Sequence, residues 1–232
     1  MSDFQIIIDR VTALTRFTGK GILFNLNYMP DTILGGIVLF ALLLQSVPLA
    51  LLGVSLFSLE FVHAGIAAFL TRAIPGLNEA AKDVARCSGH FPGISYERAT
   101  ATLLSEGTLK TLSVSFPSYY IMFFGTLFGY MFAMTQTYEK ELEKMPQKRA
   151  AVFSGAIIMA LLSAMFAIFR IGTGCDTFLS VIIAALFGLL FGFTAEKLIA
   201  FLSGRTLTNL MNVPLIRDTA PDGKPIYVCK KE

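Results

Sequence analysis

The sequence predicts an all-α integral membrane protein built as a bundle of about five transmembrane helices. Two observations lead to this fold class. Hydrophobic residues make up 54% of the 232 residues and charged residues only 15%, whereas a soluble domain has roughly 25% charged residues. The mean hydropathy is +0.65, and several stretches approach or exceed the ~20 apolar residues needed to cross a bilayer.

Residues 1–32 form the first of the segments into which we divide the chain. Within it, residues 4–18 place apolar side chains at helical spacing, with acidic, amide and arginine side chains on the other side. Such an amphipathic helix lies in the membrane interface, or it packs on the protein's own bundle or on a partner. Asp3 and Asp9 interrupt the region where a secretory signal has its charged and apolar parts, so we expect no such signal.

Residues 33–202 form the second segment, the transmembrane domain. Its expected spans cover residues 33–56, 57–74, 112–134, 150–169 and 177–202. Gln45 and Pro48 are expected to kink the first span. Small residues recur on the later spans, above all the pairs Gly125/Gly129 and Gly188/Gly192, and such residues favour close contact between membrane helices.

Residues 203–232 form a short polar C-terminal tail, with a turn expected at APDGKP and a short strand at IYV. Counting spans places the N-terminus, residues 75–110 and the Arg170–Asp176 junction on one side of the membrane. The 135–149 loop and the tail then share the other side. Nine positive charges against ten do not settle the orientation, although the compact basic 135–149 loop favours the cytosol or matrix.

Composition also excludes several classes of function. No Lys/Arg-rich block is interleaved with aromatic residues, so we expect no nucleic-acid partner. Cys87, Cys175 and Cys229 stand far apart, which argues against a structural zinc site or a disulfide framework. With only His63 and His90 in the chain, we expect no metal centre and no cofactor other than a bound phospholipid, and we interpret His63 as a satisfied interfacial histidine.

Arg170 stands where two apolar stretches meet, in the segment FRIGTGCDTFLS, and a charge at the edge of a bilayer usually marks a site. Two further short segments accompany it. LNEAAKDVARCSGH carries Lys82 and His90, and SFPSYY carries Ser118 and Tyr120. Over about residues 55–200, the order, spacing and helix-end placement of the three segments resemble the motifs of the type-2 phosphatidic acid phosphatase superfamily, which includes lipid phosphate phosphatases and vanadium haloperoxidases.

The resemblance implies which chemical roles are kept and which are replaced. The family's nucleophilic histidine corresponds to Asp176, the aspartate that orients it to Ser180, its acid histidine to Tyr120, and the arginine of its first motif to Gly89. A tyrosine with an ordinary pKa of about 10 is a poor general acid. Losing both a nucleophile and an acid removes several orders of magnitude in rate, so we expect a pseudoenzyme with no catalytic residues.

The retained residues of the resemblance are those that hold phosphoryl oxygens. We expect Lys82, Ser118 and Arg170, with His90 assisting, to bind a phospholipid phosphate near the membrane surface. The alternative is that Arg170 pairs with Asp176 within the chain and that Lys82 is solvated or extends to the interface. The sequence leaves both interpretations open.

The sequence therefore predicts a non-catalytic, lipid-phosphatase-like membrane protein that acts as an accessory or structural subunit of a larger membrane complex. Its partners would be membrane lipids and other membrane-protein subunits. The mitochondrial inner membrane is the favoured location, with the endoplasmic reticulum or a virion membrane as alternatives. A divergent active phosphatase using Asp176 or His90 is the other hypothesis. A transporter or channel has no support, because the spans show no polar stripe and no internal repeat.

Overall fold

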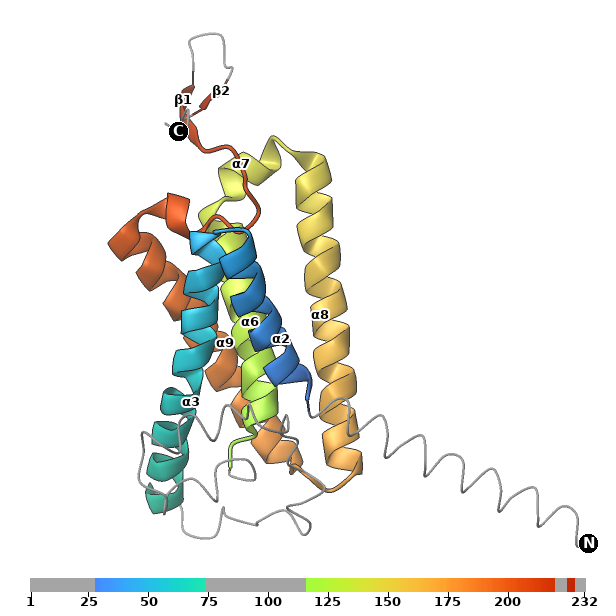
Figure 1. Ribbon diagram of the computed structural model, residues 1–232. Coiled ribbons are helices and arrows are strands. Elements are labelled where there is room, and N and C mark those ends of the chain that lie inside the picture. The colour runs from blue at the N-terminus through green and yellow to red at the C-terminus, as the bar shows by residue number, and fades with distance from the viewer. Residues whose placement is uncertain (1–27, 74–115, 220–224, 228–232) are drawn as a thin grey trace, which may run out of the picture.

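The computed structural model describes residues 28–73, 116–219 and 225–227. These residues form helices that run up and down a bundle, followed by a small antiparallel hairpin in the tail (Figure 1). In chain order the elements are α2 (Met29–Leu43), α3 (Val47–Ala73), α6 (Tyr119–Thr137), α7 (Glu139–Glu143), α8 (Pro146–Gly172), α9 (Phe178–Ser203), the 3₁₀ helix η2 (Arg205–Thr208), β1 (Ile216–Thr219) and β2 (Pro225–Tyr227). The expected helical fold class is confirmed.

Three of these helices are long and apolar enough to cross a membrane, over Val47–Leu70, Pro146–Gly172 and Phe178–Ser203. Many of their large apolar side chains are exposed on the outside of the bundle, including Phe69, Ile168 and Phe201 at 70%, 72% and 86%. A soluble protein rarely exposes so much contiguous apolar surface. The helices are thus those of a membrane protein.

The expected boundary between the first two spans is wrong. The hydrophobic pattern predicts it at residues 56/57, but α2 ends at Leu43 and α3 begins at Val47. Gln45 adopts a left-handed backbone with φ of 49°, and the Ser46 N–H bonds back to the Ala41 carbonyl at 3.0 Å. Pro48 lies in the first turn of α3, where a missing N–H is tolerated. The two residues therefore belong to a reverse turn, and α2 packs back along α3 (Figure 1).

Helix α6 forms the centre of the bundle and packs chiefly on α9, with α8 and α3 on its other sides. Its buried aromatic side chains Tyr120 and Phe124 meet Phe166 of α8, whose ring centroid is 6.0 Å from that of Tyr120 and 5.3 Å from that of Phe124. Against α9 the side chains are small instead, because Gly125 and Gly129 face the segment that carries Gly188 and Gly192. This interface brings the backbones of α6 and α9 into direct contact.

The helix ends define the two ends of the bundle. Residues 116–118 and 173–177 lie at one end, whereas residues 44–46, the α7 region and η2 lie at the other (Figure 1). In the tail, β1 pairs with β2 in a register that places Ile216 opposite Tyr227. The expected N-terminal amphipathic helix and the 75–110 segment, with Lys82, Gly89 and His90, lie outside the described residues.

Candidate functional site

A buried ion pair lies at the end of the bundle where α8 passes into α9. The Arg170 side chain, in the last turn of α8, is only 1% exposed, and its Nε donates to Oδ2 of Asp176, which is 8% exposed. The backbone brings the two together because the N–H groups of Cys175 and Asp176 both bond to the Arg170 carbonyl, at 2.9 and 3.3 Å. Gly174 makes this turn possible with a φ of 72°.

Ser118 reaches the same carboxylate from the start of α6. Its Oγ donates to Oδ2 of Asp176 at 2.6 Å, and the serine is 2% exposed. The ring of Tyr120, also buried, lies 4.1 Å from the Arg170 guanidinium carbon, a distance at which a cation and an aromatic face attract each other. Four residues from two of the sequence segments are therefore brought together around one buried charge pair.

The arrangement has a clear chemical consequence for Arg170 and Ser118. Both are donors that could hold a phosphoryl oxygen, and both donate instead to Asp176. The Asp176 carboxylate thus acts as the chain's own anion at this position. Ser180 is buried in the first turn of α9, where its backbone N–H bonds to the Thr177 hydroxyl that caps the helix.

His63 supports this end of the bundle from α3. Its Nε2 lies 2.7 Å from the carbonyl oxygen of Pro117, the residue before Ser118, and its ring packs edge-on against Tyr119. It is 1% exposed, so it is a hydrogen-bonded histidine that positions the start of α6. Within the described residues, no three His, Cys, Asp or Glu side chains come together as a metal-binding group.

Cys175 lies in the same turn and is disulfide-bonded. The expectation that the chain has no disulfide framework is wrong for this residue. Spacing alone misled the prediction, because a disulfide requires proximity in space and not in sequence. The partner cysteine lies outside the described residues.

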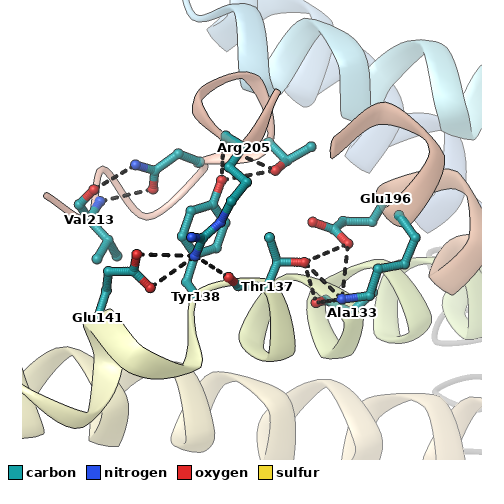
Figure 2. Close-up of polar contacts among 10 residues, drawn as sticks. Ala133, Thr137, Tyr138, Glu141, Glu196, Arg205 and Val213 are labelled. Atoms are coloured by element: carbon teal, nitrogen blue, oxygen red, sulfur yellow. Dashed lines mark hydrogen bonds and ion pairs between the residues drawn. The ribbon is translucent and has the colours of Figure 1, made fainter. Parts of the chain in front are cut away.

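A second polar cluster, at the opposite end, ties the tail to the bundle (Figure 2). The Tyr138 hydroxyl donates to the Arg205 carbonyl and pairs with the Thr208 hydroxyl at 2.9 Å. The Arg205 guanidinium donates to both carboxylate oxygens of Glu141, at 3.1 and 3.0 Å. These contacts join η2 to the α6–α7 junction, and their role is to anchor the tail.

Replacing Tyr138 by phenylalanine should destabilise the protein at neutral pH by about 1–3 kcal/mol, because the Arg205 carbonyl and Thr208 lose a buried partner. Burial raises the pKa of Tyr138 above its ordinary value of 10.0, opposed by the Thr208 hydrogen bond. Above pH 10.0 the unfolded chain therefore releases this proton first, and the wild type loses stability as the pH rises. Phenylalanine does not titrate, so the difference in melting temperature between the two proteins should shrink. A difference that stays constant would contradict this role of the phenol.

No protein-family model matches the chain, and comparisons with curated proteins and with solved structures found no match. The class of the protein therefore rests on its own fold and site. It is a helical membrane protein whose central helix pair is closed at one end by a buried Arg–Asp–Ser cluster.

Proposed function

We propose that this chain is a non-catalytic relative of the lipid phosphatases that serves as a structural, accessory subunit of a larger membrane assembly. The observation that carries the proposal is the Asp176 carboxylate, which accepts from both Arg170 and Ser118. A phosphoryl group would need the same two donors. Because Arg170 and Ser118 both bind the Asp176 carboxylate, the chain's own anion occupies the position where an enzyme of this kind would bind the phosphoryl group of its substrate.

The replaced residues support the same conclusion. Tyr120, at the position of the family's acid, packs its ring against the Arg170 guanidinium. Ser180, at the position of the orienting aspartate, belongs to the first turn of α9. Both side chains are buried, so these positions contribute to packing of the bundle in place of proton transfer. We further propose that α2 and α6 complete a five-helix bundle in the membrane.

A phospholipid phosphate bound by Arg170, Ser118, Lys82 and His90 is the function that this geometry favours less. Arg170 is almost fully buried, and the Asp176 carboxylate would repel a phosphate placed beside it. Native mass spectrometry separates the two cases, because a phospholipid lost on substitution of Arg170 would support the lipid site.

The Cys175 disulfide supports an orientation for the proposed subunit. Structural disulfides persist in oxidising compartments, so the end that carries Arg170 and Asp176 would face such a compartment. The basic loop that contains Lys144, Lys148 and Arg149 would then face the cytosol or matrix, as the charge rule favours. The mitochondrial inner membrane, the endoplasmic reticulum and a virion membrane all provide this arrangement.

The proposal predicts that the purified protein releases no phosphate from phosphatidic acid or a prenyl diphosphate above the level of an Arg170→Ala variant. It also predicts stable partner subunits on purification in a mild detergent, which mass spectrometry identifies. Phosphate release that is abolished by Arg170→Ala would establish the alternative, a divergent phosphatase. A monomer without partners would remove the subunit role.

A further inference from the structure

A groove of about 1070 Å³ opens between α6 and α8 near the end of the bundle that carries the tail. Toward the other end of the bundle the two helices touch through Phe166, whose ring packs on Tyr120 and Phe124, and Met159 of α8 also packs on the same core. The walls are mainly apolar, with the large side chains Phe128, Met131, Phe132, Val152 and Phe153 and the small Ala150 and Ala156. The groove is therefore large and apolar, and its α8 wall belongs to the helix Pro146–Gly172, which is long and apolar enough to cross a membrane.

The rim of this groove is charged. Glu139 and Glu143 of α7, Arg149 in the first turn of α8, and Lys197 of α9 all line it. Within the described part of the chain, none of the ion pairs uses Glu139, Glu143 or Arg149. Because Ala156 lies two helical turns beyond Arg149, the apolar walls continue for about 10 Å below the charged rim.

Lys197 is held in place at the rim by the end of α6. Its Nζ donates to the Ala133 carbonyl at 3.2 Å and to the Thr137 hydroxyl at 2.9 Å. The same Nζ lies 3.9 Å from Oε2 of the buried Glu196. Because an ammonium group has three donors, a ligand phosphate here would share Lys197 with these protein groups. The side chain is 37% exposed and therefore accessible from the groove.

The shape and chemistry of the groove identify the kind of occupant. Membrane helices pack where small residues let two backbones approach, and the α6 wall, with Phe128, Met131 and Phe132, offers no such small face. Flexible acyl chains fit between such side chains. The rim carries two cations and two carboxylates, which complement a headgroup with one phosphate and one ammonium. An anionic headgroup without an amine would be repelled by Glu139 and Glu143.

We propose that this groove binds one bilayer phospholipid with an amine-bearing zwitterionic headgroup, of the phosphatidylethanolamine type. Its phosphate lies at Arg149 and Lys197, its ammonium at Glu139 and Glu143, and one acyl chain runs along Phe132 and Phe153. The site is at the opposite end of the bundle from the Arg170–Asp176 pair. The lipid site can therefore be tested independently of the proposed accessory function.

Native mass spectrometry of the full chain tests this site after reconstitution into vesicles with equal amounts of phosphatidylethanolamine, phosphatidylcholine and phosphatidylglycerol. The wild type should retain one phosphatidylethanolamine per chain. The double variant Arg149→Gln/Lys197→Gln should bind phosphatidylethanolamine about tenfold more weakly or worse, as expected for the loss of one charge-assisted hydrogen bond. Lys140→Gln/Lys144→Gln, exposed on the same charged region but outside the lining, should retain it.

A second pair of variants tests the apolar part without altering charge. Ala156→Phe fills the groove and should abolish lipid retention, whereas Ala164→Phe, on an exposed part of α8 outside the groove, should not. Melting temperatures in lipid-free detergent show whether each variant is folded.

Three results would overturn the inference. The first is full retention of phosphatidylethanolamine by the folded Ala156→Phe variant. The second is preferential retention of phosphatidylglycerol. The third is efficient cross-linking of two copies through Phe153→Cys, which would assign the groove to self-association.

Discussion

Replacing Gly192 by alanine should separate α9 from α6. It should destabilise the bundle more than a single methyl group added anywhere else in the described helices. A Cβ at this position would collide with the Thr126 carbonyl oxygen and lie 2.8 Å from the Tyr130 backbone nitrogen. These are backbone atoms of a helix, which cannot rotate away as a side chain can. Overpacking of this kind typically costs about 1–3 kcal/mol, and more where the surroundings are rigid, so we expect a loss at or above the top of that range.

Gly188 should respond in the same way, because an added Cβ would collide with the Met122 carbonyl. Gly65 on α3 and Gly155 on α8 are the matched controls, since no atom lies within 4 Å of a Cβ built there. Alanine at those positions should leave stability unchanged or raise it slightly through helix propensity. Thermal unfolding in detergent, followed by circular dichroism, measures all four variants. Equal melting temperatures for Gly192→Ala and Gly155→Ala would show that the α6–α9 interface does not hold the bundle together.

The small faces of α6 and α9 could be predicted from the sequence, although not that these two faces pack on each other, whereas the α2–α3 turn could not be predicted. The pairs Gly125/Gly129 and Gly188/Gly192 carry a periodic signal, because glycine every fourth residue leaves one bare helix face. Residues 33–74 have no glycine pair four residues apart, and Gln45 and Pro48 predicted a kink there in place of a turn. The turn there depends on the left-handed backbone of Gln45, which a residue of this type rarely adopts and which no sequence pattern indicates.

The candidate site was predictable only where its residues are near one another in the chain. Arg170 and Asp176 are six residues apart across a turn, so their pairing was one of two interpretations open from the sequence. The contact of His63 with Pro117 spans 54 residues, and that of Arg205 with Glu141 spans 64. Such contacts depend on how helices stack. For the same reason the groove depends on the angle between α6 and α8, which sequence periodicity does not determine.

Replacing Asp176 by alanine should cost about 3–5 kcal/mol, the range for removing one partner of a buried ion pair. Arg170 would stay buried and lose its ion pair with Asp176, and Ser118 would lose its acceptor. The double variant Arg170→Met/Asp176→Ala should be more stable than Asp176→Ala alone, because it removes the buried charge together with its partner. Lys140→Gln, an exposed charge on α7, is the control and should have no measurable effect. A double variant no more stable than the single one would show that the buried charge is not the cause.

The same variant tests whether Asp176 stands in the place of an anion. Removing its carboxylate takes away the acceptor that Arg170 and Ser118 share. Inorganic phosphate or sulfate should then raise the melting temperature of Asp176→Ala with increasing concentration, because a ligand that binds only the folded state stabilises it. The wild type should not respond, since its site already holds a carboxylate, and chloride at equal ionic strength should have little effect on either protein. Stabilisation of both proteins to the same extent would mean that the anion binds elsewhere. Asp176 would then be a packing residue that does not occupy an anion-binding position.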